Sequence, residues 1–216
     1  MDRTLFLPRA TFALIAGASL TASALAAPPR LDIPPGKYEL DPRHSSLTFR
    51  VKHMGLSNYT ARFTRFGAAI DLDPARIENS KVTATVDPTS VETDYPGERD
   101  FDAEIARKPT FLDADRYPKA EFVSRSVRVR KDGTLEVTGD LAMRGATHPV
   151  TLNVKINAAK LHPFSKRPVL GISARGQLQR SLWGVTDSLP DIAADNVGLE
   201  IEGEFLRADD GKAASK

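Results

Sequence analysis

The chain has 216 residues, with 30 Lys and Arg against 28 Asp and Glu, and it has no cysteine. This length suits one ordinary domain, and a hydrophobic content of 41% supports a packed core and excludes a mainly disordered chain. The lack of cysteine excludes disulfide scaffolds, cysteine-ligated metal sites and a thiol nucleophile. The near-balanced charge argues against a nucleic-acid partner, because such binding needs a clustered basic excess.

Residues 1–26 have the features of a secretory signal peptide. Arg3 and Arg9 precede an uncharged, Ala-rich stretch, and Ala24-Leu25-Ala26 forms a cleavage site of small residues. We therefore expect export, removal of this segment and a periplasmic location. A retained membrane anchor is the alternative, but the stretch is short and only weakly apolar for a spanning helix.

Residues 37–207 form the predicted folded domain, between a Pro-rich lead at 27–36 and a loose polar tail at 208–216. Apolar and polar residues alternate through most of this domain, which is typical of β-strands with one buried face. Together with a strand over 120–130, the alternating runs predict eight long strands. In chain order, the other runs are centred on Leu47 to Val51, Phe66 to Leu72, Val82 to Val86, Leu135 to Met143, Val150 to Ala158, Leu170 to Leu178 and Val197 to Phe205.

Several segments depart from this alternation. Phe63 and Phe66 differ in parity, as do Phe122 and Val123, so we expect a bulge or bend near each pair. Residues 87–119 lack alternation and are predicted to form an irregular excursion that contains one short amphipathic helix. A second long loop is expected over 187–196.

Eight amphipathic antiparallel strands without a helical layer must bury one face, either in a sandwich or in a closed barrel. We predict an all-β, eight-stranded antiparallel barrel with a short helical excursion between strands. An eight-stranded barrel is either filled by side chains or holds one small ligand. The small residues on the apolar face indicate either a cavity or positions where strands coil tightly or pack against an aromatic ring, and the sequence leaves both interpretations open. They are Ala68, Ala84, Gly139, Ala158, Ala174, Gly176 and Gly203.

The sequence contains little that indicates catalysis. Its four histidines lack metal-binding spacing, and no phosphate-binding glycine motif occurs, so we expect neither a metal nor a cofactor. His53 shares the parity of the apolar face, while His44 is expected to bond backbone and close one end of the barrel. Arg180 is expected to stack on Trp183 and plug an end; a cation near a ligand head group is the alternative.

Short motifs follow one another from about Tyr38 to Arg207. They are Tyr38-Glu39-Leu40-Asp41 with His44-Ser45, Phe49-x-Val51-x-His53-x-Gly55, Phe63-x-x-Phe66-x-x-x-Ile70-x-Leu72-Asp73-Pro74, Ser90-Val91-x-Thr93, Arg99-Asp100, Phe111-Leu112-Asp113, Tyr117-Pro118, Phe122-x-Ser124, Val137-x-Gly139-x-Leu141, Gly145-x-Thr147-x-Pro149-Val150 and Arg180-x-x-Trp183-Gly184. Their order resembles the YceI family of lipocalin-like periplasmic proteins. The resemblance implies a lipocalin-like barrel whose pore holds a long polyisoprenoid chain, with no catalytic residue. Two departures lie in the excursion: Phe101-Asp102-Ala103 replaces a usual histidine, and Leu112 stands where the family often has Phe.

The leading hypothesis is a carrier or reservoir for an isoprenoid lipid or quinone, with transient contact to the inner membrane or a membrane quinone protein; a homodimer is left open. One alternative is an enzyme on a small apolar substrate with His53 or His44 as base. Another is a filled barrel without ligand that acts in a stress response. Parity assigns the following residues to ligand binding: Leu47, Phe49, Val51, His53, Ile70, Val82, Ala84, Val86, Leu141, Met143, Leu152, Val154, Ile172, Ala174, Leu199 and Ile201.

Overall fold

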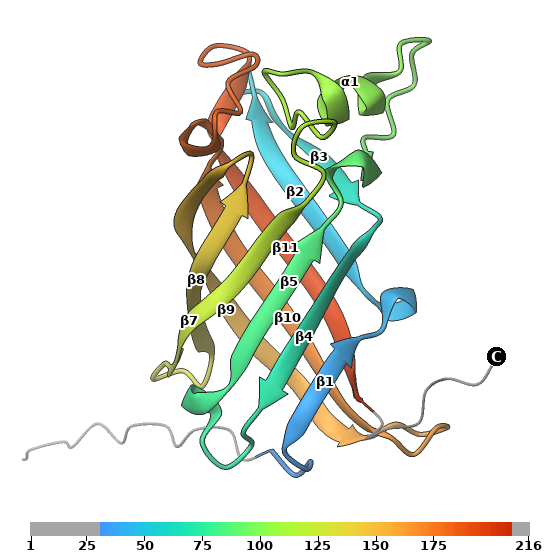
Figure 1. Ribbon diagram of the computed structural model, residues 1–216, viewed down its shortest axis with the longest axis vertical. Helices are drawn as coiled ribbons and strands as arrows, with labels where there is room; N and C mark the ends of the chain where they lie inside the picture. The colour runs from blue at the N-terminus through green and yellow to red at the C-terminus, as the bar shows by residue number, and fades with distance from the viewer. Residues whose placement is uncertain (1–30, 209–216) are drawn as a thin grey trace, which may run out of the picture.

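A computed structural model describes residues 31–208 and confirms the predicted barrel (Figure 1). Each strand pairs antiparallel with its neighbours, and the pairing of Leu40 with Phe205 closes the ring. The expected signal peptide, residues 27–30 of the Pro-rich lead and residues 209–216 of the polar tail lie outside the described residues. In order around the barrel, the strands are β1 (Gly36–Leu40), β4 (Phe66–Leu72), β5 (Lys81–Val86), β7 (Ala120–Val129), β8 (Leu135–Met143), β9 (Ala146–Leu161), β10 (Pro168–Gln179) and β11 (Ala193–Arg207).

Three further strands prolong the wall at one end of the barrel. They are β2 (Ser46–His53), β3 (Ser57–Phe63) and β6 (Val91–Glu92), and they add to the free part of β11 in that order. The strands β1 and β2 pair with successive parts of β11, while β3 and β4 pair with β2 and β1. Each of these pairs of segments therefore acts as one long strand with a break. The strands beyond the eight predicted runs are β1, β3 and the two-residue β6.

The two predicted irregularities occur where the parity changes. The chain bends between Phe63, which ends β3, and Phe66, which begins β4. In β7 the register shifts between Ser124 and Ser126. These breaks allow inward side chains of opposite parity to face the same interior.

The predicted helix is α1 (Phe101–Arg107), and it lies across one end of the barrel (Figure 1). The carboxylate of Asp100 accepts a hydrogen bond from the backbone N–H of Ala103 at 2.9 Å, which caps the first turn. Ile105 and Ala106 are buried on the face that meets the strands. No helix within 31–208 is long and apolar enough to cross a membrane.

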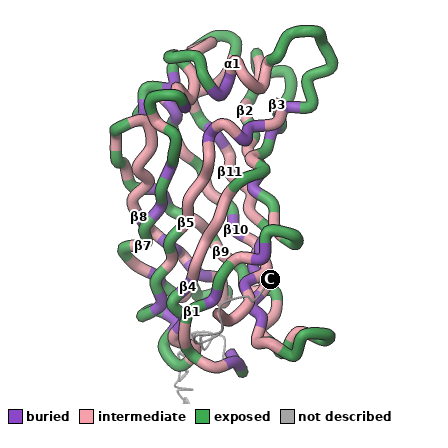
Figure 2. Tube along the Cα trace, turned by 45° about the vertical axis from the view of Figure 1, so that its right-hand side comes forward, coloured by how far each residue is buried: buried purple, intermediate pink, exposed green. Residues whose placement is uncertain are grey.

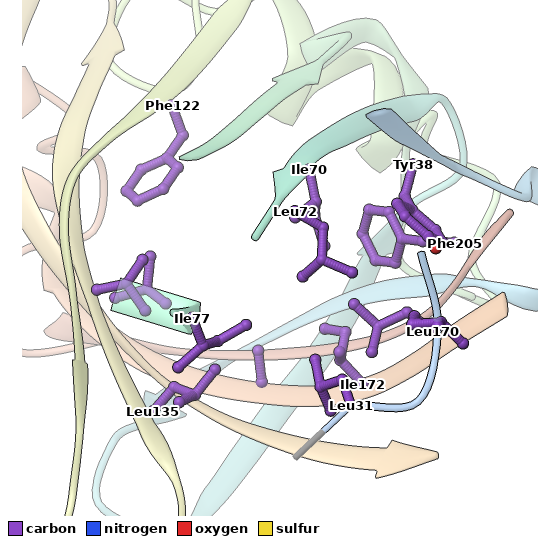
Figure 3. Close-up of a cluster of buried hydrophobic side chains, with 14 of the residues drawn as sticks. Leu31, Tyr38, Ile70, Leu72, Ile77, Phe122, Leu135, Leu170, Ile172 and Phe205 are labelled. Atoms are coloured by element: carbon purple, nitrogen blue, oxygen red, sulfur yellow. The ribbon is translucent and has the colours of Figure 1, made fainter. Parts of the chain in front are cut away.

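The other end of the barrel is closed by side chains from outside the ring of strands. Ile77, in a short 3-10 helix (Ile77–Asn79), joins Leu31 and Ile33 in the main hydrophobic core. Figure 3 shows Ile77 beside Leu135, and Leu31 beside Leu170 and Ile172. Along the strands, buried or half-buried positions alternate with exposed ones (Figure 2).

Candidate functional site: an apolar cavity in the barrel

The barrel encloses a cavity of about 230 Å³, measured as the space open to the centres of water molecules. A single water needs about 10–15 Å³ on this measure, so the space suits a guest much larger than water. Except for Ser80 and Thr85, every lining residue carries an apolar side chain. Water inside would find few hydrogen-bond partners, and a hydrocarbon chain would lose nothing by entering.

The burial of the inward side chains agrees with a hollow interior. Val82, Leu152, Val154 and Ile201 point into the barrel, yet each is only half-buried. In a filled barrel such residues would be surrounded by neighbours and fully buried. Their remaining exposed surface faces the cavity.

Most of the residues that parity assigned to ligand binding line this cavity. The structure therefore gathers them in one place, while their role in binding stays a prediction. They are Leu47, Ile70, Val82, Ala84, Val86, Leu141, Met143, Leu152, Val154, Ile172, Ala174, Leu199 and Ile201.

Phe49, Val51 and His53 differ from the other predicted residues, because they are not among the residues that line the cavity. They share the parity of Leu47, but they lie farther along β2, beyond the cavity and towards the end of the strand at His53. The ring of Phe49 packs on Phe63 with 5.3 Å between centroids, in the cluster that α1 covers. Parity could not indicate this for Phe49, because α1, which packs with it, is distant in sequence.

Many cavity residues were missing from the predicted set. Several, such as Leu135 and Val137, belong to the same alternating runs and could have been included on that signal. Ile77 and Leu112 lie in segments without periodicity and carry no such signal. The additional lining residues are Leu40, Phe63, Phe66, Ala68, Leu72, Ile77, Ser80, Thr85, Pro88, Leu112, Ala120, Phe122, Val127, Leu135, Val137, Val150, Ile156, Leu170, Leu178 and Phe205.

The small residues on the inner face serve two purposes. Ala68 and Ala84 pair across β4 and β5 and line the cavity, as does Ala174. The glycines are different, because their missing side chains leave room for neighbours. A Cβ on Gly139 would lie 2.5 Å from the Phe122 ring, and one on Gly176 would lie 2.6 Å from Leu152. Both readings of the sequence therefore hold, at different positions.

Residues 108–112, here called the strap, follow α1 and cover the cavity end. Leu112 contributes to the lining. From the turn after β8, the Arg144 guanidinium donates hydrogen bonds to the backbone carbonyls of Phe111 and, at 2.9 Å, Pro109. The positive φ of Arg144 (51°) and of Gly145 (76°) forms a tight hairpin turn that aims this side chain at the strap.

The strap is also fastened to the loop before β11. The Asp187 carboxylate accepts a hydrogen bond from Thr110 Oγ1 at 2.7 Å. It also forms an ion pair with Lys108 Nζ at 2.6 Å. Burial alone would raise the pKa of Asp187, but hydrogen bonds from Lys108, Ser188 and Thr110 outweigh it and lower the pKa to about 2. The carboxylate is therefore charged near neutral pH.

Arg180 and Trp183 both close the α1 end, but not as a stacked pair. Arg180 is buried and donates to the carbonyls of Ala193 and Ala194, each at 2.9 Å. The Trp183 indole N–H donates to Leu141 O at 3.0 Å, and its ring meets His148 edge-on. Backbone carbonyls attract the guanidinium more strongly than the indole face, because they satisfy its buried N–H groups.

His44 also differs from expectation. Its ring nitrogen Nδ1 bonds the Asp41 carboxylate at 3.0 Å, not a backbone group, and its side chain is about half exposed. Asp41 is buried and receives further hydrogen bonds from Arg43. Those bonds hold the pKa of Asp41 well below its usual range. This group lies at the break between β1 and β2.

One buried polar atom close to the aromatic cluster under α1 is unsatisfied. The Tyr59 hydroxyl has no hydrogen-bond partner among residues 31–208. Its ring meets Phe101 edge-on at 6.3 Å. Among residues 31–208, no group of three or more His, Asp or Glu side chains is arranged to hold a metal ion.

The fold and the cavity define the class: an antiparallel, lipocalin-like β-barrel built around an apolar interior. The YceI-like domain model matches residues 38–205, so the chain belongs to the YceI-like domain family. It is 32% identical to Protein YceI of Shigella flexneri over 77% of this chain and 85% of that one. It is 36% identical to a UPF0312 protein of Vibrio cholerae, over 66% of this chain and 72% of the relative.

Solved structures have the same fold. Burkholderia cenocepacia BcnA superposes with a TM-score of 0.66 at 23% identity, covering 76% of this chain and 98% of BcnA. The Campylobacter jejuni YceI protein gives 0.62 at 25% identity, covering 73% and 90%. A polyisoprenoid binding domain from Saccharophagus degradans gives 0.56 at 13% identity, covering 79% and 98%.

Proposed function

We propose that this protein is a carrier or reservoir that holds one long isoprenoid lipid, of the quinone or polyprenyl type, in the barrel cavity. The apolar cavity is the observation that carries the proposal. Family membership is consistent with it, and a structural neighbour is named a polyisoprenoid binding domain. No cofactor other than this lipid is required.

The physical task is to remove an insoluble chain from water. Burying apolar surface stabilises a complex by roughly 25 cal/mol per Å². A wall of Val, Leu, Ile, Ala and Met side chains provides this without directional contacts, so it accepts a flexible chain in many conformations. Lining residues lie at both ends of the barrel, with Ile77 at one end and Leu112 at the other, which suits an extended tail.

The location we propose is the periplasm, based on the signal peptide expected at residues 1–26. A carrier there would collect and deliver its lipid at the inner membrane or at a membrane quinone protein. An aqueous compartment between two membranes is the setting in which an isoprenoid tail needs such a shelter.

We propose no catalytic role. His44 bonds Asp41 outside the cavity, and His53 is not a lining residue. A base for the enzyme hypothesis would have to reach a substrate in the cavity, and neither histidine lies there. Turnover of an apolar substrate that His53→Ala abolishes, with lipid uptake intact, would support the enzyme instead.

Organic extraction of the purified protein, followed by mass spectrometry, tests the proposal. We expect a prenyl lipid in extracts of the natural sequence. The matched control carries Ala68→Leu and Ala84→Leu, which fill part of the cavity and should deplete the lipid. The proposal fails if extracts contain no prenyl lipid and the protein takes up no added decylubiquinone.

A further inference from the structure

The hairpin between β9 and β10 carries a positive charge that the rest of the chain does not share. Residues 141–186 contain seven Lys or Arg and no Asp or Glu, although the whole chain is nearly neutral. Three of these cations lie in residues 160–167, here called the basic tip. The hairpin leaves the barrel at the end opposite α1 (Figure 1).

Large apolar side chains are exposed among these charges. Phe164 is 88% exposed and Leu161 is 59% exposed, which is unusual for side chains of this size. Polar residues would normally occupy the tip of such a hairpin, because their side chains stay hydrated there. An exposed Phe flanked by Lys on both sides is the pattern of a lipid-interface anchor.

The basic tip is a built loop that presents Phe164 outward. The His162 ring nitrogen Nδ1 accepts from the backbone N–H groups of Phe164 at 3.3 Å and Ser165 at 3.1 Å. The backbone N–H of Lys166 donates to His162 O at 3.0 Å, and that of His162 donates to Arg167 O at 2.8 Å. The conformation is therefore set before any partner arrives, which lowers the entropy cost of docking.

Two cations of the basic tip, Lys160 and Lys166, are not neutralised by an ion pair with a carboxylate of residues 31–208. Farther along the hairpin, Arg175 pairs with Glu200 of β11 at 2.7 Å. Glu202 and Glu204 share an outer groove with Lys160 and His162 behind the tip. Neither Lys160 nor Lys166 forms an ion pair within residues 31–208, and Lys166 Nζ donates to Pro163 O. Their charges remain available to a partner.

We propose that the basic tip docks the protein on an anionic phospholipid bilayer, with Phe164 and Leu161 entering the interface and Lys160 and Lys166 meeting the phosphates. Charge complementarity selects this partner, because a basic surface and apolar anchors together match an anionic lipid surface. The end of the barrel closed by Ile77 then faces the bilayer. The inference extends the proposed function by naming the surface that meets the membrane.

The test is co-sedimentation of the secreted protein with vesicles of phosphatidylglycerol and phosphatidylcholine, compared with phosphatidylcholine alone. We expect binding to the anionic vesicles that weakens as salt rises. Phe164→Ser should weaken it about tenfold, and Phe164→Trp should restore it. Lys160→Ala and Lys166→Ala should each cost about fivefold.

The matched controls are Leu56→Ser and Lys52→Ala, which should leave vesicle binding unchanged. Leu56 is 82% exposed in the turn between β2 and β3, at the α1 end. Lys52 is exposed near the end of β2, also at the α1 end. Loss of binding in Leu56→Ser but not in Phe164→Ser would overturn the proposal and move the docking surface to the other end.

Absence of vesicle binding would also overturn the proposal. So would binding to neutral vesicles as strong as that to anionic vesicles, or a Phe164→Ser variant that binds as strongly as the natural sequence. Binding of the basic tip to an acidic protein but not to vesicles is a further contradicting outcome. Uptake of decylubiquinone in solution is measured in parallel. If uptake persists without vesicle binding, docking alone fails; if vesicle binding persists without uptake, the lipid-carrier proposal fails instead.

Discussion

Ala68 and Ala84 face each other on β4 and β5, and their methyl groups leave space where a larger residue would meet its neighbour. Such positions distinguish a hollow barrel from a filled one. In a filled core, added methylene groups force side chains out of their rotamers and cost about 1–3 kcal/mol. In a cavity, the same groups gain contacts.

Ala84→Leu should therefore keep or raise the free energy of unfolding, by up to about 1 kcal/mol, and weaken decylubiquinone binding. Urea denaturation measures the first effect, and quenching of Trp183 fluorescence measures the second. A clear loss of stability with unchanged quinone binding would mean that the space beside Ala84 is already filled.

Asp41 provides a test of the electrostatics at the break between β1 and β2. Its pKa is lowered in the folded protein, so its stabilising effect is complete above the ordinary carboxyl pKa of about 4 and is lost as pH falls below that value. Asp41→Asn should cost about 1 kcal/mol at pH 7. The difference from the natural sequence should shrink at pH 3.

Urea denaturation at the two pH values checks this, with Asp71→Asn as the control. Asp71 is exposed on β4 and should show little effect at either pH. A cost for Asp41→Asn that is equal at pH 7 and pH 3 would contradict the assignment of charge to that carboxylate.

At the scale of elements, α1 and the strap together form a cover made from residues that lie between β6 and β7 in the chain. Arg144 and Asp187 hold the strap through polar contacts at its outer edge, while Leu112 faces the cavity. The Asp187 carboxylate stays charged down to about pH 4, and its contacts with the strap are lost as pH falls towards its pKa of about 2. A guest that enters from solution at this end must displace the strap, whereas docking through the basic tip places the Ile77 end on the bilayer.

Arg144→Ala should accelerate both uptake and release of decylubiquinone severalfold, with little change in the dissociation constant. The reason is that Arg144 holds the strap but does not line the cavity. Stopped-flow Trp183 fluorescence measures both rates, and Arg125→Ala, on the outer face of β7, is the control. Unchanged rates would place the entrance elsewhere.

The strand runs could be predicted because each strand separates a wet face from an apolar one. Leu135–Met143 was predicted with its observed bounds, since both faces of β8 are chemically distinct along its length. The strand β1 was not among the predicted runs, because its five residues become a strand by pairing with β4 and with the end of β11. Phe49 lies outside the cavity lining for a similar reason, because it packs in the cluster that α1 covers.

At the scale of the whole molecule, the ends of the barrel were the least predictable part of the site. Ile77 and Leu112 close opposite ends from segments without periodicity, and only the tertiary fold brings them to the cavity. Between these ends, period-two alternation from many strands suffices to build an apolar interior. A closed ring of strands leaves no other place for that face.

The central claim is that apolar burial along the cavity, and not a head-group contact, holds the guest. Native mass spectrometry and Trp183 fluorescence with ubiquinones of increasing tail length test it most directly. We predict one ligand per chain. The free energy of binding should become more favourable by roughly 0.8 kcal/mol for each buried methylene until the cavity is full. An affinity independent of tail length, or no binding at any length, would contradict the account.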